Sequence, residues 1–311
     1  MSLEQIKESR YFDCSIYNEY AKKKAAFIFF VSPVPGIFND IDDDKLALVS
    51  KIKSTTKKYF VEKEVNDEIS WTIVPLYNEY WEKELGINNL EKVLYQICMI
   101  DKNYKENWNN ELEKLGRVSK KINELKLEYL HYQNSKGTDL KIGLPKNYHF
   151  ESVGDAPVLV NMPSYEVYTS PHKDMTEGIV YSSKPLLYNG SVIDDFYIEF
   201  KNGKVVNYHA KRGEEILKSI IEFDEGSSYL GEVALVEHTS PISKTGIIFK
   251  TTLLDENASC HLALGRGFGK GKEINFSDIH VDFMVGTGDL MITGYKDGKE
   301  YPIMKNGKYV I

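Results

Sequence analysis

Acidic and imidazole side chains with metal-ligand spacing are concentrated in the second half of the sequence. The segment LLDENASCHLALGRGF, residues 253–268, places Glu256 five positions before His261. We interpret the apolar residues that follow Asp255 as a short helix, with His261 on its first turn beside the preceding carboxylate. A carboxylate and an imidazole held together provide half of a divalent-cation site. For this segment taken alone, a capped core helix with one hydrogen-bonded histidine remains the alternative.

Three further segments carry matching groups. SDIHVDFMVG places His280 and Asp282 two residues apart, so in a strand both side chains leave the same face. Glu232 lies inside the apolar run SYLGEVALV, and Glu166 follows a proline turn in NMPSYEVYTSP. A carboxylate within an apolar strand is costly unless it is paired or binds a cation. Each group alone could be a salt bridge or a solvated edge, but their number in one half of the chain favours a metal site.

Five motifs follow one another as NMPSYEVYTSP, EGIVYSSKPLLYNG, LGEVALVEHTSPI, LLDENASCHLALG and IHVDFMVG. In this order they resemble the thermophilic metallo-aminopeptidase family, from about SWTIVP at residue 70 to the C-terminus. The resemblance implies a cytoplasmic homodimer that uses two divalent ions, zinc, cobalt or manganese, to remove residues from peptides with a free N-terminus. A water shared by the two ions is the implied nucleophile, and Glu232 or Asp282 is the implied bridge between them. The implied metal ligands are Glu166, Glu232, Glu256, His261, His280 and Asp282.

The resemblance also implies catalytic roles, with one departure. Glu232 and Glu256 are the implied catalytic carboxylates, and a tyrosine is expected seven residues after the histidine of DENxxxH, where this chain has Phe268. Glu177, in TEGIV, is a candidate for holding the substrate's amino group or for supporting the site. Because Phe268 has no hydroxyl, a catalytically weak metal- and peptide-binding homologue is the main alternative. A metal hydrolase of small amides is a further one.

Composition excludes other classes of function. A formal net charge of -7 over 311 residues argues against nucleic acid as a partner, because phosphate binding needs a basic face. The three cysteines are widely spaced and odd in number, which favours a reducing compartment over a disulfide framework. No apolar run is long enough to span a membrane, and the N-terminus is too charged for a signal peptide.

Hydrophobic periodicity predicts an α+β fold in two portions. Residues 1–124 form a mixed α/β portion, with a buried strand at AAFIFFV, a second at residues 69–75, and helices at 43–60, 88–100 and 105–124. We expect this portion to be a remnant of the family's N-terminal α/β domain, most of which the chain lacks.

Near Leu125 the apolar period changes from helical to alternating, which marks the predicted domain boundary. Residues 125–311 then form a mostly antiparallel β domain that carries the metal site. A hairpin opens this domain at residues 125–145, and one helix interrupts it at 212–223. Four dipeptides predict tight hairpin turns: Asn189-Gly190, Asn202-Gly203, Asp297-Gly298 and Asn306-Gly307.

Overall fold

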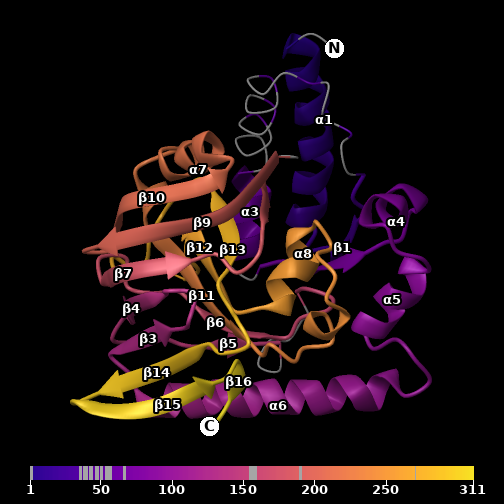
Figure 1. Ribbon diagram of the computed structural model, residues 1–311. Coiled ribbons are helices and arrows are strands. Elements are labelled where there is room, and N and C mark those ends of the chain that lie inside the picture. Colours follow the sequence, from indigo (N-terminus) through magenta and orange to yellow (C-terminus); the bar gives the residue numbers. More distant parts are fainter. Residues whose placement is uncertain are drawn as a thin grey trace.

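Helices dominate the first third of the molecule, and antiparallel sheets make up most of the rest (Figure 1). The computed structural model describes residues 3–34, 58–65, 68–153, 160–188, 191–269 and 271–311, together with positions 37, 41, 45, 49 and 52. The predicted α+β class is confirmed. Within these residues, no helix has the length and apolar character that a membrane crossing requires.

A small parallel pair of strands forms the N-terminal part. Strand β1 (Phe27–Val31) pairs with β2 (Trp71–Pro75), and α1 (Leu3–Lys22) and α3 (Lys58–Val65) lie beside them. Phe27 packs edge-on against Phe60 of α3, with ring centroids 4.9 Å apart. Ile28 and Phe30, which point the other way, are 63% and 64% exposed. The prediction of a buried strand is therefore wrong, because the described residues cover one face of this pair and leave Ile28 and Phe30 exposed. The helix predicted at 43–60 falls largely outside the described residues.

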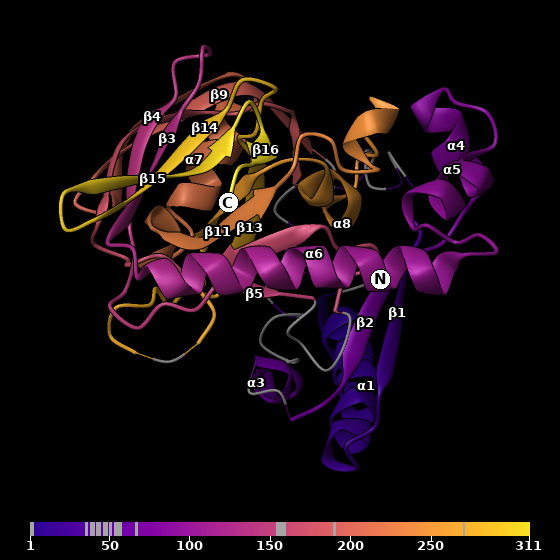
Figure 2. The same cartoon turned by 90° about the horizontal axis from the view of Figure 1, so that it is seen from below.

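Three helices follow β2: α4 (Glu79–Leu85), α5 (Leu90–Ile97) and α6 (Tyr104–Leu125). The last two confirm the helices predicted at 88–100 and 105–124. Helix α6 runs along the bottom of the molecule in Figure 1, from the sheets to the region of α4 and α5, and Figure 2 shows it from below. Its buried residues Leu115, Val118 and Ile122 belong to the core formed by the strands that follow. The predicted division after residue 124 stays a prediction.

The described strands of the C-terminal part form two antiparallel sheets. The nine-stranded sheet contains, in spatial order, β10 (Lys204–Arg212), β9 (Ser191–Lys201), β7 (Thr176–Tyr181), β4 (Asp139–Gly143), β3 (Tyr129–Gln133), β14 (Met291–Lys296), β15 (Lys299–Lys305) and β16 (Lys308–Tyr309), with β8 (Leu186–Tyr188) paired to β9. The five-stranded sheet contains β13 (His280–Met284), β12 (His261–Gly265), β11 (Leu230–Val236), β6 (Glu166–Thr169) and β5 (Glu151–Ser152).

Most of the predicted turns are confirmed. The Asn202-Gly203, Asp297-Gly298 and Asn306-Gly307 dipeptides each join paired strands and have positive φ at both residues, as a two-residue hairpin turn requires. The fourth dipeptide, Asn189-Gly190, lies outside the described residues. The hairpin predicted after Leu125 is β3 and β4. The helix predicted at 212–223 is α7 (Glu214–Ile221).

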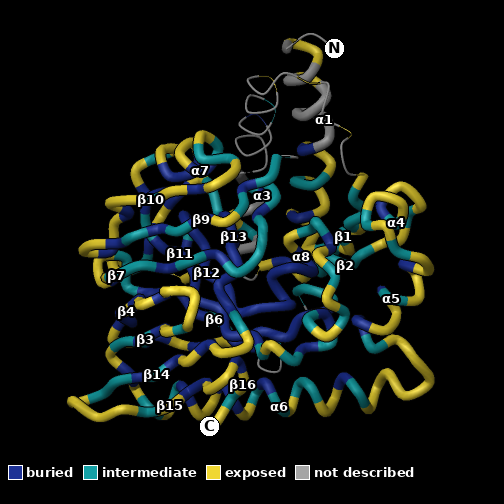
Figure 3. Tube along the Cα trace, in the orientation of Figure 1, coloured by how far each residue is buried: buried dark blue, intermediate teal, exposed yellow. Residues whose placement is uncertain are grey.

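The two sheets share one apolar core, and Figure 3 shows their inner strands as buried. The five-stranded sheet contributes one face to it, including Val167, Val233, Leu262 and Phe283. Because side chains alternate along a strand, the neighbours of these residues point to the opposite face of that sheet. The candidate metal ligands lie on that opposite face.

A second core couples the helices to the segment before β12. Trp81 of α4 is fully buried, and its Nε1 donates a 2.7 Å hydrogen bond to the backbone carbonyl of Phe249. The Trp81 and Phe249 rings also meet edge to face, with centroids 6.3 Å apart. The packing of α4 therefore fixes the chain just ahead of α8 (Thr252–Asp255).

We expect Trp81→Phe to lower the free energy of unfolding by at least about 1–3 kcal/mol, because the buried carbonyl of Phe249 loses its donor. Tyr80→Phe is the matched control, since Tyr80 is the preceding residue of the same helix and is 63% exposed. Its effect should stay within about 0.5 kcal/mol. Urea unfolding of the three proteins measures both, and equal stability of Trp81→Phe and wild type would contradict the coupling.

Candidate metal centre

The register of the five-stranded sheet brings five of the predicted ligands onto one face. Glu166 pairs with Val236, and two residues earlier on β11 Ala234 pairs with His261. Further along β12, Ala263 pairs with Glu232 of β11 on one side and with Asp282 of β13 on the other. Gly265 of β12 pairs with His280 of β13. Directly paired residues share a face, and so do alternate residues of one strand. The five side chains that result are Glu166, Glu232, His261, His280 and Asp282.

The position of His261 corrects the sequence interpretation. The predicted helix ends before it: α8 stops at Asp255, a 3-10 turn spans Glu256–Ala258, and Ser259 is already extended. His261 is the first residue of β12 instead of a residue on a first helical turn. The run HLALG is buried at every position, so its sequence has no clear period, and five residues suit a buried strand better than a helix.

One group of possible ligand atoms comes from Glu166, Glu232 and His261, which lie within 4.8 Å of one another. The Nε2 atom of His261 is 3.3 Å from Oε2 of Glu166. Its Nδ1 atom lies 3.0 Å from the backbone carbonyl of Glu256 and 3.2 Å from that of Ser259. With Nδ1–H donating to these carbonyls, Nε2 faces the carboxylates and could bind a metal ion once it gives up its proton, which is the usual orientation of a metal-ligating histidine.

A second group comes from Glu232, His280 and Asp282, and it shares Glu232 with the first. The Nε2 atom of His280 lies 2.9 Å from Oε2 of Glu232 and 3.2 Å from Oδ1 of Asp282. Its Nδ1 atom is 2.7 Å from the backbone carbonyl of Arg266. Both histidines are thus oriented by a backbone carbonyl and present Nε2 to the same carboxylate-rich face.

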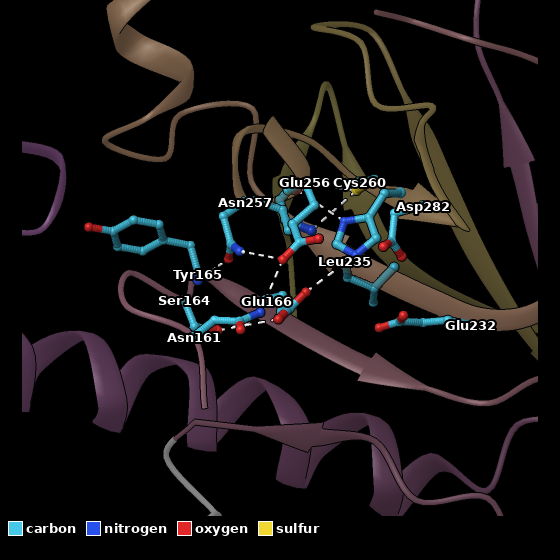
Figure 4. A network of polar contacts seen from close by, with 12 residues as sticks. Asn161, Ser164, Tyr165, Glu166, Glu232, Leu235, Glu256, Asn257, Cys260 and Asp282 are labelled. Atoms are coloured by element: carbon cyan, nitrogen blue, oxygen red, sulfur yellow. Dashed lines mark hydrogen bonds and ion pairs between the residues drawn. The ribbon is translucent and has the colours of Figure 1, made fainter. Parts of the chain in front are cut away.

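The sixth predicted ligand, Glu256, reaches this face from the 3-10 turn and belongs to neither group (Figure 4). Its Oε1 atom accepts hydrogen bonds from the amides of Asn161, at 3.0 Å, and Asn257, at 3.4 Å. The neighbouring Asp255 is turned toward the backbone, where it accepts from the N–H groups of Phe249 and Thr251. Of the two acids in DEN, only Glu256 enters the candidate centre.

The histidines are held as cations by the carboxylates around them. Burial alone would lower the pKa of His261, but the carboxylate of Glu166 outweighs it and raises that pKa to about 10. For His280, burial is again outweighed, here by Asp282 and Glu232, and its pKa lies well above the ordinary value. In the protein without metal, these two protons supply the positive charge that the cluster needs.

The carboxylates respond in different directions. Burial raises the pKa of Glu232 and, together with the charges of Asp282 and Glu166, raises that of Glu256 well above its ordinary value. Burial would raise the pKa of Asp282 as well, but His280 outweighs it and lowers that pKa. These carboxylates are all at most 8% exposed. Buried carboxylates this close together are stable only when cations, either protons or metal ions, compensate their charge.

One further observation indicates that these residues suit a divalent metal ion. Oδ1 of Asp282 is buried and accepts no hydrogen bond from the described part of the chain, although His280 is close by. A buried carboxylate oxygen without a donor is costly, and metal coordination removes that cost. Carboxylate oxygens and imidazole nitrogens together suit borderline cations such as zinc, cobalt and manganese.

Phe268 lies at the rim of the candidate centre. Its ring is 5.2 Å from the ring of His280 and 5.6 Å from that of Tyr168, centroid to centroid. Sequence reasoning missed Tyr168, although its place two residues after Glu166 in a strand puts both side chains on one face. Burial raises the pKa of Tyr168, with the charges of Glu151 and Glu166 adding, so its phenol stays protonated.

Glu177 lies elsewhere in the fold. It is exposed on β7 of the nine-stranded sheet, and its Oε1 accepts a 2.6 Å hydrogen bond from the backbone N–H of Asn202 at the β9–β10 turn. The structure therefore does not bring it to the other predicted residues through any contact that it describes.

Three carboxylates and two imidazoles on one buried face, with Glu256 beside them, could hold divalent cations in the way that metal-dependent hydrolases do. The chain belongs to the thermophilic metalloprotease (M29) family, whose profile matches residues 1–309. The similarity thus begins at residue 1, so the prediction that it starts near residue 70 is wrong in extent. The five motifs that carry the resemblance all lie after residue 160, so they give no information on the N-terminal part.

Several curated relatives are aminopeptidases. The chain is 38% identical to aminopeptidase AmpS of Bacillus subtilis (strain 168) over 320 aligned positions, which cover 94% of this chain and 78% of that protein. It is 33% identical to aminopeptidase PepS of Streptococcus thermophilus, over 93% of this chain and 77% of that protein. The solved structure of wild-type AmpT from Thermus thermophilus matches with a TM-score of 0.88 and 28% identity, over 97% of this chain and 80% of that one.

We expect Glu232→Gln to remove at least one divalent ion per chain, because Glu232 is the one carboxylate common to both groups. Wild type should hold two ions. Elemental analysis after incubation with zinc or cobalt and gel filtration measures the stoichiometry. Glu215→Gln, an exposed glutamate of α7, is the matched control and should behave as wild type. Equal metal content in Glu232→Gln and wild type would rule out a shared ligand.

Proposed function

We propose that this protein is an aminopeptidase that removes N-terminal residues from peptides with the help of two divalent metal ions. The observation that carries the proposal is the pair of three-residue groups that share Glu232. Glu166 and His261 would hold one ion, His280 and Asp282 the other, and Glu232 would join them. The aminopeptidase names of the relatives, and their similarity over most of the chain, support the reaction class.

When bound, such ions acidify a water at neutral pH and polarise the carbonyl of the scissile bond. The chain itself must then hold and move a proton. We assign this to Glu256, the predicted ligand that lies outside both groups, at its Oε2 atom. Asn161 and Asn257 orient this carboxylate through Oε1. Glu256 takes the proton that the attacking water gives up and delivers it to the leaving amine.

Selectivity for a free N-terminus requires a group that holds the α-amino group of the substrate. One of the buried carboxylates of the centre, or a bound metal ion, would hold it. Glu177 remains a sequence-based candidate for the amino group, but its carboxylate already accepts from Asn202 in the nine-stranded sheet. We therefore assign recognition of the amino group to the acidic centre itself.

The second candidate function is a metal- and peptide-binding homologue with weak catalysis. Phe268 favours it, because this rim residue has no hydroxyl to offer a reacting substrate. We further propose a homodimer in a reducing compartment such as the cytoplasm. The buried thiols of Cys98 and Cys260, which are outside any disulfide, agree with that compartment.

Peptides with a free N-terminus should be cleaved, and the same peptides should be inert after N-acetylation. The reason is that the acidic centre recognises the ammonium group, which acetylation removes. Mass spectrometry of a peptide ladder, with zinc or cobalt added, identifies the products residue by residue. A panel of aminoacyl p-nitroanilides gives the rates, and no cleavage with either metal would favour the weakly catalytic alternative. Internal cleavage of an acetylated peptide would refute an exopeptidase.

Glu256→Gln should keep both metal ions and lose turnover by about 10²- to 10⁴-fold, the usual contribution of a positioned acid–base group. The amide preserves the shape of the side chain but cannot accept the proton. Metal content and kcat are measured on the same samples, with Glu215→Gln as the control. Loss of a metal ion from Glu256→Gln would identify Glu256 as a ligand and remove the assigned proton transfer.

A further inference from the structure

Two aromatic rings form a wall beside the candidate centre. Phe268 is 44% exposed and meets His280 on one side and Tyr168 on the other. Its backbone N–H donates a 2.6 Å hydrogen bond to Oγ of Ser170, which ties this loop to the end of β6. Phe268 is thus held in place at the rim, but its side chain has no polar atom. Tyr168 supplies the one hydroxyl of this ring pair.

Tyr168 stands on the same face of the sheet as the ligands. It follows Glu166 by two residues on β6, and it pairs with Ala234 of β11, which in turn pairs with His261. Since paired and alternate residues share a face, the phenol ring lies over the sheet on the side of the carboxylates. The edge-to-face contact with Phe268 fixes its orientation.

The phenol has a proton to donate. Its hydroxyl is 3.3 Å from Oε2 of Glu151, on the edge strand β5. An O–H···O bond is usually about 2.7–2.8 Å long, so this contact is weak and the hydroxyl can exchange it for a better acceptor. Glu151 is exposed and loses little when water replaces the phenol.

Among the described residues, the neutral side-chain donors beside the clustered carboxylates already have acceptors, and the hydroxyl of Ser164 donates to Oε1 of Glu166 at 3.4 Å. The amides of Asn161 and Asn257 donate to Glu256, and the two histidines present Nε2 to the carboxylates. Attack of water on a peptide carbonyl moves the π electron pair onto the carbonyl oxygen. Collapse of that intermediate returns the pair and breaks the C–N bond. A donor aimed at the oxygen lowers this barrier without losing its own proton.

We propose that Tyr168 is a catalytic residue of this enzyme, the phenol that donates a hydrogen bond to the carbonyl oxygen as it becomes an oxyanion. This inference rests on the proposed aminopeptidase function. Of the two aromatic rings beside the centre, only that of Tyr168 carries a hydroxyl, so Phe268 could not donate this hydrogen bond.

The test compares wild type, Tyr168→Phe and Tyr95→Phe, each loaded with zinc or cobalt. Tyr95→Phe is the matched control, because it also removes a phenol–glutamate contact, with Glu91 on the exposed surface of α5. Tyr168→Phe should lower kcat and kcat/KM together by about 10²- to 10³-fold, with KM and metal content unchanged. Tyr95→Phe should match wild type. Phe268→Tyr in the Tyr168→Phe background, which places a phenol on the adjoining ring, should raise kcat above that of the single variant.

Binding provides a readout apart from turnover. The aminophosphonic acid analogue of leucine carries a tetrahedral anionic group in place of the carbonyl, whereas leucine itself does not. In calorimetry, Tyr168→Phe should weaken binding of the phosphonate by about the same factor as kcat and leave that of leucine unchanged. Equal weakening of both ligands would overturn the inference, because it would make Tyr168 a general binding contact.

If Tyr168 only stabilises the local structure through its contact with Glu151, the variants should behave differently. Glu151→Gln and Tyr168→Phe would then lower the melting temperature and turnover alike, and that outcome would overturn the inference. If wild type cleaves the p-nitroanilides and Tyr168→Phe cleaves them equally fast, the inference fails and the aminopeptidase proposal stands. If wild type cleaves none of them with either metal, both fail together.

Discussion

Buried negative charge on one face of the five-stranded sheet is the constraint that the rest of the structure has to satisfy. Five of the six clustered groups come from strands whose other face is packed in an apolar core, so these side chains cannot turn away toward water. The burial of isolated ionised carboxylates costs more free energy than the net folding stability of a typical domain. The cost is offset only if cations, whether the protons on His261 and His280 or metal ions, occupy the same space.

The geometry of the centre depends on close backbone approach at the ends of β11 and β12. A Cβ atom at Gly231 would lie 2.3 Å from the carbonyl oxygen of Arg266, and Gly265 has a φ of +100°. That same carbonyl of Arg266 accepts from Nδ1 of His280 and so sets which nitrogen faces the carboxylates. Side chains at either glycine would push this strand end apart and rotate the histidine. The two glycines therefore help to position His280, although neither has a side chain that could react or bind a metal ion.

The sequence predicts which candidate ligands share a face where alternation is visible, and it fails where alternation is absent. The spacing of His280 and Asp282, and an acid inside the apolar run of β11, indicate a common face because strands alternate. The fully buried run of β12 has no such period, so the sequence alone does not distinguish a strand from a helix at His261. Tyr168 carries no charge that would mark it, so the contact of its ring with Phe268 at the rim of the centre becomes visible only in the structure.

The N-terminal part of the fold does more than add length, because two paths connect it to Glu256. In one, β2 holds the segment of Asn161: the N–H of Ile73 donates to the carbonyl of Val160, and Met162 donates back to Ile73. Asn161 then orients the glutamate. In the other, Trp81 binds the carbonyl of Phe249, whose N–H donates to Asp255, the residue before Glu256. Displacement of either β2 or α4 would thus move the one acid that the sheet does not position, while the five groups on the strands would keep their register.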